Sequence, residues 1–181
     1  MLVGILLAGG KSLRMGQDKA LLVRQGQTQL AHCYQLLQSL ACDMILVSHP
    51  QYGLADRYSE KGPLAGIESC VNHFLNQAYS QAQAIVIPID MPLLIAKDIE
   101  LLITTSRITH QACCFSSTVL PFSFFINAST ALQLKAQMKT SDLAIGRFLK
   151  QINTVQVSPF CESRLLNTNT PESWQPLTTT A

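Results

Sequence analysis

The amino-acid sequence predicts a single α/β domain over residues 1–181, built on a Rossmann-like, doubly wound, mostly parallel sheet with helices on both faces. Short apolar runs of strand length alternate with longer segments of helical period, which is typical of this class. A glycine pair, Gly9-Gly10, follows the first apolar run directly, as at the turn from a strand into a ligand-binding loop. With 181 residues, 48% hydrophobic and 13% charged, the chain can bury one sizeable core.

The alternation is clearest in the first half of the chain. The apolar residues after the polar loop that follows Gly10 recur at helical spacing, and Pro63 suits the first turn of a helix. In order, the expected elements are a strand at 3–8, a helix at 29–40, a strand at 44–47, a helix at 62–78, a strand at 84–89 and a helix at about 97–105.

The second half is less regular. Strands at 112–115 and 122–126 are expected to pair as a hairpin, and 129–150 to be helical with a break near residues 140–141. Residues 153–157 and 164–167 are expected to form the final strands.

Charge and hydropathy exclude several classes of protein. Thirteen basic and eleven acidic residues give a net charge of +2 without a basic run, so no nucleic-acid or membrane surface is expected. Apolar runs such as 85–89 are far too short to cross a bilayer. The apolar start of the chain lacks a basic region before it and leads into the glycine loop, so no signal peptide is expected. The sequence sets no expectation for the oligomeric state.

The six cysteines contain no C-x-x-C pair, and most of them lie in apolar segments. Buried free thiols in a reducing cytoplasm are expected, with a zinc site or a disulfide framework as the alternatives. The four histidines have no ligand spacing, which favours surface or hydrogen-bonded structural positions. His49, beside Ser48, is the one that we expect near a ligand.

The first motif that carries chemistry spans residues 7–22, LAGGKSLRMGQDKALL. Paired glycines after a strand allow backbone N–H groups to approach an anion closely. Lys11, Arg14 and Lys19 add three cations, which suits a triphosphate. The spacing fits neither a Walker A loop nor G-x-G-x-x-G. The structural alternative is a strand-to-helix turn with solvated lysines.

Asp90 comes directly after the third predicted strand, at the edge of a parallel sheet where ligands collect. One carboxylate there, together with substrate phosphates, is a sufficient Mg²⁺ site. The alternative is a helix N-cap or a turn residue before Pro92.

Two further segments support both a structural and a functional interpretation. GPLAG at 62–66 is either a helix start or a backbone surface on which a flat purine lies. Asn167 and Asn169 share a face if they end a strand, with Thr170 capping a helix that begins at Pro171. The functional alternative is that one asparagine faces Asp90 and holds the metal or an acceptor phosphate.

These segments together resemble the molybdenum cofactor guanylyltransferase family of MobA-like nucleotidyltransferases. The resemblance rests on residues 7–22, 62–67 and 167–172, in matching order and spacing. It implies GTP as donor and molybdopterin, or its molybdate-loaded form, as acceptor. The terminal phosphate of the acceptor would attack the α-phosphate of GTP and release pyrophosphate. Related cytidylyltransferases usually have Ala-Ala-Gly where this chain has Ala8-Gly9-Gly10, which favours guanine.

The resemblance also implies roles for individual residues. Asp90 would contact both nucleotide and Mg²⁺, Ser48 would lie near the base, and Asp56 would be an acidic nucleotide contact. Lys19 would contact the nucleotide, and it would be catalytic together with Asp90. Arg14 is expected, on physical grounds, to be a third catalytic residue as a cation near the phosphates. The remaining nucleotide contacts would be Leu7, Ala8, Gly9 and Gly10.

Two alternative functions remain open. One is a cytidylyltransferase acting on molybdopterin or a sugar-like phosphate. The other is a non-catalytic nucleotide-binding module, which the nearly apolar stretch 119–125 favours because family members often carry more polar residues there.

Overall fold

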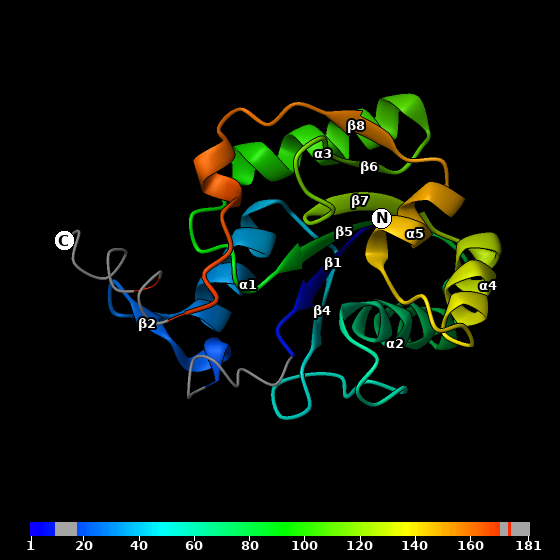
Figure 1. Cartoon of the computed structure of the whole chain (residues 1–181), viewed down its shortest axis with the longest axis horizontal. Helices are drawn as coiled ribbons and strands as arrows, with labels where there is room; N and C mark the ends of the chain where they lie inside the picture. Colours follow the sequence, from blue (N-terminus) through cyan, green and yellow to red (C-terminus); the bar gives the residue numbers. More distant parts are fainter. Residues whose placement is uncertain (10–17, 171–173, 175–181) are drawn as a thin grey trace.

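The computed structural model describes residues 1–9, 18–170 and 174. A six-stranded sheet in the order β4-β1-β5-β7-β6-β8 forms its centre (Figure 1). Only β7 runs against the other strands of this sheet, so the predicted mostly parallel sheet is confirmed. The strands in chain order are β1 (Leu2–Leu7), β4 (Met44–Ser48), β5 (Ala82–Pro88), β6 (Cys113–Phe115), β7 (Phe122–Ile126) and β8 (Val155–Val157).

Helices cover both faces of the sheet, as predicted (Figure 1). One face carries α1 (Gln29–Ser39) and α3 (Ala96–Thr109), and the other carries α2 (Pro63–Asn76), α4 (Ala128–Gln137) and α5 (Ile145–Gln151). Because side chains alternate across a strand, β1 contributes to both cores. Ile5 packs with the α2 side and Leu6 with the α1 side, both fully buried. This double burial explains the continuous apolar run in the sequence.

The predicted elements of the first half are present, with ends shifted by a few residues. The expected hairpin of β6 and β7 is confirmed by their antiparallel pairing. The expected break in the fourth helical region is also present, between α4 and α5. There Gln137 Nε2 donates to the carbonyls of Asp142 and Ala144, each at 3.0 Å, and stabilises the connecting turn.

The predicted strand at 164–167 is wrong, because a 3₁₀ helix, η2 (Glu162–Leu165), occupies half of it. The Arg164 guanidinium lies 3.0 Å from the buried Asp98 carboxylate of α3, and Leu165 is buried against the same core. These two anchors favour a tight turn over an extended strand.

The predicted polar loop contains more structure than expected. A 3₁₀ turn, η1 (Lys19–Leu21), precedes a small hairpin of β2 (Val23–Arg24) and β3 (Gln27–Thr28). The hairpin turns at Gln25 and Gly26, whose φ angles are +51° and +75°. Two consecutive residues with positive φ are typical of a two-residue hairpin turn. In the sequence the only sign of this turn is Gly26, which the loop prediction did not use.

No helix in the described part of the chain is long and apolar enough to cross a membrane. The six cysteines are free thiols, as expected, and Cys33, Cys70, Cys113 and Cys114 are buried.

Candidate nucleotide-binding site

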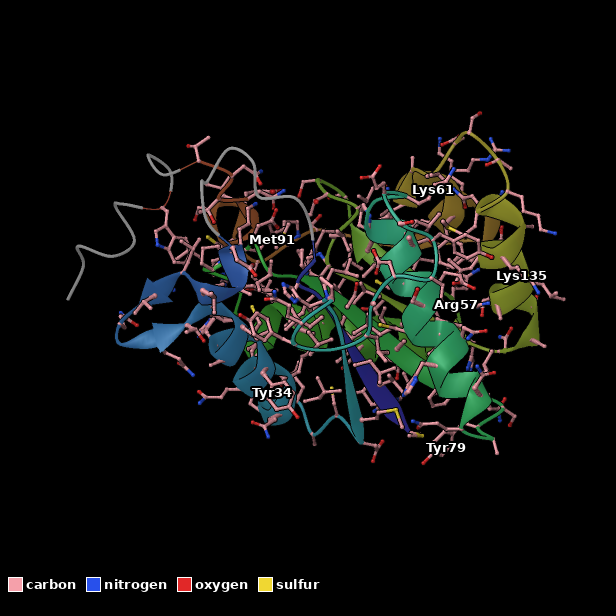
Figure 2. The ribbon with its side chains drawn as sticks, turned by 90° about the horizontal axis from the view of Figure 1, so that it is seen from below. Tyr34, Arg57, Lys61, Tyr79, Met91 and Lys135 are labelled. Carbon is pink, nitrogen blue, oxygen red and sulfur yellow. The ribbon has the colours of Figure 1, made fainter. Side chains whose placement is uncertain are left out.

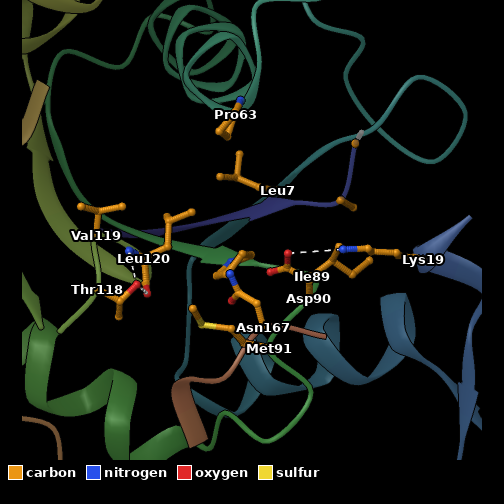
Figure 3. A pocket seen from close by; sticks show the side chains of 13 residues that line it. Leu7, Lys19, Pro63, Ile89, Asp90, Met91, Thr118, Val119, Leu120 and Asn167 are labelled. Atoms are coloured by element: carbon orange, nitrogen blue, oxygen red, sulfur yellow. Dashed lines mark hydrogen bonds and ion pairs between the residues drawn. The ribbon is translucent and has the colours of Figure 1, made fainter. Parts of the chain in front are cut away.

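Three parallel strands end side by side at one edge of the sheet. The register pairs Leu7, the last residue of β1, with Ser48 of β4 and with Pro88 of β5. A pocket of about 320 Å³ opens at this edge (Figure 3). Its lining consists of Leu7, Ala8, Gly9, Lys19, Pro63, Pro88, Ile89, Asp90, Met91, Thr118, Val119, Leu120 and Asn167. Such an edge is where open parallel sheets bind ligands.

The structure brings Lys19, Asp90 and Asn169 together at this pocket. The Lys19 ammonium lies 3.4 Å from Asp90 Oδ2 and donates to Asn169 Oδ1 at 2.6 Å. Figure 3 shows the Lys19 and Asp90 side chains pointing toward one another. Both are partly shielded, with side-chain exposures of 16% and 22%. Charges in such a setting interact more strongly than they do in open water.

Asp90 is fixed by the C-terminal segment rather than used as a helix cap. The backbone N–H of Thr168 donates to the Asp90 carbonyl at 2.8 Å, and the Thr168 hydroxyl donates to it at 3.2 Å. The N-cap of α3 is Ile95, so the interpretation of Asp90 as a helix N-cap is wrong. The Asp90 carboxylate is therefore free of any capping bond and faces the pocket.

The β2–β3 hairpin also supports the loop that carries Asp90. Arg24 Nη1 donates to the Pro92 carbonyl at 2.7 Å. Met91, which precedes Pro92 in the chain, is almost fully buried and lines the pocket. The loop after β5 is thus held from both sides, by Arg24 and by Thr168.

Ser48 and Asp56 are joined to each other rather than placed in the pocket lining. Ser48 is buried, and its hydroxyl donates to Asp56 Oδ1 at 2.9 Å. Ser48 also packs closely against Gly66 of α2, where a Cβ would collide with Ser48 Oγ. The expected contacts of Ser48 and Asp56 with the nucleotide stay predictions.

The loop that carries Asp56 is anchored on α2. The backbone N–H of Arg57 donates to Ser69 Oγ at 2.8 Å, and its guanidinium pairs with Glu68 at 3.0 Å. Burial raises the pKa of Glu68, and the nearby Arg57 and Lys135 oppose that rise. Figure 2 shows Arg57 over α2 and Lys135 on the neighbouring α4. These contacts hold the loop that carries Asp56 against α2.

The GPLAG segment has the structural role that the sequence suggested. Gly62 has a φ of +70° and precedes α2, and Pro63 is its first residue. Pro63 also lines the pocket, so the start of α2 borders the space that a ligand would occupy. The expected contact with a purine stays a prediction.

Asn167 and Asn169 are exposed on either side of the buried Thr168, as an extended chain requires. Their expected strand is absent. Asn167 lines the same pocket as Asp90, and Asn169 accepts a hydrogen bond from Lys19, which also contacts Asp90. That one of them holds a metal or an acceptor phosphate stays a prediction. The helix that we expect after Thr170 would begin at Pro171, which lies outside the described residues. Gly10 and Arg14 also lie outside them.

Sequence reasoning missed several contributors to the site. Thr168 lies inside the segment 167–172, but the sequence assigned no role to it. Arg24 belongs to a hairpin that was predicted as loop. The pocket wall at Val119 and Leu120 is apolar, and the Thr118 hydroxyl is used inside that loop, where it donates to the Leu120 carbonyl at 2.9 Å.

The donor set fits a metal that is held jointly with a ligand. Within residues 1–9, 18–170 and 174, no three His, Cys, Asp or Glu side chains gather in a way that could hold a metal ion. Oδ1 of Asp90 has no hydrogen-bond partner among the described residues. One available carboxylate oxygen matches Mg²⁺, which usually takes one or two carboxylates together with substrate phosphates.

Comparison with known families decides the class. Residues 4–155 match the model of the MobA-like NTP transferase domain. The chain belongs to this family. Within it, the chain is 35% identical over 182 aligned residues to a molybdenum cofactor guanylyltransferase of Xanthomonas euvesicatoria pv. vesicatoria (strain 85-10), covering 96% of this chain and 93% of that protein. The resemblance predicted from the three motifs is therefore confirmed.

Solved structures agree on the fold. Molybdopterin-guanine dinucleotide biosynthesis protein A of Archaeoglobus fulgidus superposes with a TM-score of 0.68 at 17% identity, over 98% of this chain and 97% of that one. The 2-C-methyl-D-erythritol 4-phosphate cytidylyltransferase of Thermus thermophilus gives 0.67 at 12% identity, over 98% of each chain. The fold is thus common to enzymes named for different bases.

Proposed function

We propose that this protein transfers GMP from GTP to the terminal phosphate of molybdopterin and releases pyrophosphate. The observation that carries the proposal is the Lys19–Asp90–Asn169 cluster at the pocket, in a chain 35% identical over 96% of its length to a molybdenum cofactor guanylyltransferase. The cluster offers a cation for phosphate and a carboxylate for a metal in one place.

The chemistry requires positioning and charge neutralisation. A phosphate acceptor is already ionised at neutral pH, so it can attack the α-phosphate without a covalent enzyme intermediate. Lys19 would balance negative charge on the triphosphate as pyrophosphate leaves. Arg14 would add a second cation, and Leu7 to Gly10 would present backbone N–H groups to the phosphates.

Mg²⁺ is the metal that we assign to Asp90. Bound there, it would supply Lewis-acid stabilisation of charge on the phosphates. Asp90 would hold it through its available oxygen, while the Thr168 bonds keep the carboxylate's backbone in place. Asn167 and Asn169 would bind the acceptor phosphate beside it.

A non-catalytic nucleotide-binding module is the second candidate. The apolar Val119–Leu120 wall favours it, because that wall offers few polar groups to a charged acceptor. A cytidylyltransferase has weaker support, since the similarity to a cytidylyltransferase is one of fold, at 12% identity.

The deciding experiment measures calorimetric binding of GTP, CTP, ATP and UTP with Mg²⁺, followed by pyrophosphate release with each triphosphate and molybdopterin. GTP is expected to bind most tightly, by about 1–3 kcal/mol, because the wrong base leaves edge hydrogen-bonding groups unpaired. Equal affinities would contradict the guanine assignment. GTP binding without pyrophosphate release would instead favour the binding module.

The expected setting of the reaction is the cytoplasm, with GTP and molybdopterin as small-molecule partners. The free state of all six cysteines supports a reducing compartment.

A further inference from the structure

A chain of hydrogen bonds leads from the end of β4 to the turn that carries Lys19. Its members are His49, Asp18 and the 3₁₀ turn η1. We infer that His49 is a positioning residue for Lys19, which it orients by fixing the carboxylate of Asp18. The inference rests on the proposed function, in which the Lys19 ammonium binds the triphosphate.

His49 is held in one orientation. Its side chain is only 6% exposed, and Nδ1 accepts the backbone N–H of Gln51 at 3.1 Å and of Tyr52 at 3.3 Å. The ring also stacks on Tyr52, with 4.6 Å between centroids and 25° between planes. A nitrogen that accepts these bonds carries no proton, so in the neutral ring the proton is on Nε2. Nε2 therefore donates to Asp18 Oδ2, 3.0 Å away.

Asp18 uses its two carboxylate oxygens on two different partners. Oδ2 meets His49, while Oδ1 accepts the backbone N–H of Ala20 at 2.9 Å and caps η1. The Asp18 carbonyl also accepts from the N–H of Leu21 at 3.1 Å. Rotating the carboxylate would break at least one of these bonds. Ala20 is also fully buried. The turn is therefore held by the bonds of Asp18 on one side of Lys19 and by the burial of Ala20 on the other.

Lys19 is the one member of this turn that reaches into the site. Its ammonium contacts both Asp90 and Asn169. In the chain, Lys19 stands between Asp18, which caps the turn, and the buried Ala20. A lysine side chain has many rotamers, so its reach depends on where the backbone places its Cα. A misplacement of about 1 Å in a binding group can cost on the order of 10²-fold in rate. His49 and Asp18 remove that freedom.

The test is a double-mutant cycle between His49→Ala and Lys19→Ala, measured as GTP·Mg²⁺ affinity by calorimetry and as pyrophosphate release. In the wild-type background, His49→Ala is expected to weaken GTP binding by about fivefold to tenfold, the size of one ordinary hydrogen bond, because the change acts on Lys19 only through Asp18. In the Lys19→Ala background the same change is expected to have almost no effect, because its target is gone. His49→Gln, whose amide can donate to Asp18, should recover part of the affinity.

Two further variants keep the test decisive. Asp18→Asn keeps an oxygen that can accept from the N–H of Ala20, but its amide nitrogen cannot accept from His49. It should therefore repeat the His49→Ala pattern, and it provides the test if His49→Ala folds poorly. His73→Ala, which removes a ring bonded to Gln77 at the end of α2, should match the wild type. Equal losses in both Lys19 backgrounds, or unchanged affinity in His49→Ala, would overturn the inference while leaving the proposed function intact. A wild-type protein that binds no triphosphate would overturn both.

Discussion

Lys19 is the residue at which distant parts of the chain meet. Its ammonium contacts Asp90, which follows β5, and Asn169, which lies 150 residues further along the chain. The Asp90 carboxylate balances the charge of the ammonium, and the Asn169 amide oxygen accepts a hydrogen bond from it. Lys19 therefore has partners before a ligand binds. An incoming phosphate would compete with Asn169 for that ammonium.

Lys19→Ala is expected to weaken GTP binding by about 10- to 100-fold, since a hydrogen bond to a charged group contributes about 1.5–3 kcal/mol. The melting temperature should change little, because the side chain is not part of the hydrophobic core. Calorimetry and thermal melts check both statements. Lys139→Ala, an exposed lysine after α4, is the matched control. Wild-type turnover in Lys19→Ala would mean that this lysine takes no part in the transfer.

Asp90→Ala should reduce turnover by roughly 10²-fold or more, as expected when an electrostatic contact of the transition state is lost. Nucleotide binding should persist in weakened form, because the phosphates can still bring Mg²⁺. The bonds from Thr168 go to the Asp90 carbonyl, so they survive the substitution and stability should hold. Pyrophosphate release and thermal melts on one preparation measure the two effects. A variant that is destabilised yet fully active would rule out the metal role.

At the scale of elements, the position of α2 depends on a glycine, Gly66, at which the helix packs closely on the sheet. A Cβ on Gly66 would collide with Ser48 Oγ and approach Ser48 Cβ to 3.0 Å and Leu7 Cδ2 to 3.2 Å. Ser48 and Leu7 are the last residues of β4 and β1. α2 therefore packs closely on the ends of both strands, and Leu7 of β1 also lines the pocket.

Gly66→Ala is expected to destabilise the fold by about 1–3 kcal/mol, the usual cost of overpacking a tight contact. Gly146→Ala in α5 is the control, since its Cβ would meet Val119 Cγ1 at an ordinary 3.6 Å. Urea unfolding of both variants gives the comparison. The control should be neutral or slightly stabilising, because alanine favours a helix over glycine. Equal stability of the two variants would mean that α2 can shift at no cost.

The η2–α3 junction depends on one ion pair. Asp98 is only 1% exposed, and Arg164 Nη2 lies 3.0 Å from its Oδ1. Neither Asp98 side-chain oxygen has a hydrogen-bond partner among the described residues, so the guanidinium provides the compensation for burial of this carboxylate.

Arg164→Ala is expected to cost about 2 kcal/mol of unfolding free energy, because it leaves a buried carboxylate unpaired while water can partly replace the partly exposed arginine. Arg147→Ala, which breaks a solvent-exposed pair with Asp142 at 3.6 Å, should cost less than about 1 kcal/mol. Chemical denaturation of both proteins measures the difference. A loss in Arg164→Ala no larger than that in Arg147→Ala would contradict the junction's role.

At the scale of the whole molecule, burial in the two hydrophobic cores separates thiols with raised pKa values from the one whose pKa is lowered. Burial raises the pKa of Cys33 and of Cys70 to about 12, and that of Cys113 to about 11. Cys161 differs, because a hydrogen bond from Ser163 lowers the pKa of its thiol. The thiolate is the reactive form, so the thiols should differ widely in rate.

A disulfide reagent such as DTNB is expected to modify Cys161 first at pH 7–8, since its lowered pKa gives it the larger thiolate fraction. Cys161→Ser should abolish that fast phase and leave the slow phases unchanged. Unfolding in urea should then expose the remaining thiols together. A fast phase that survives in Cys161→Ser would assign it to another thiol.

The sequence predicted β1 and β5 well because both are continuous apolar runs, and it predicted α2 well because Pro63 marks the first turn of that helix. It also predicted the edge at which Asp90 and Lys19 meet, because the carboxyl ends of parallel strands converge. It could not predict η2, whose turn depends on the remote Asp98, or the two bonds from Thr168 to Asp90. Long-range contacts of this kind leave no local pattern in the chain.

The position of Thr168 and Asn169 after β8 also bears on how the protein matures during translation. A chain emerges from the ribosome from its N-terminus, so every strand of the sheet is available before these two residues are. A nascent chain can therefore build its sheet while Asp90 still lacks the Thr168 bonds and Lys19 still lacks Asn169. Folding and catalytic competence would then be separate events, with the second delayed until the C-terminal segment docks.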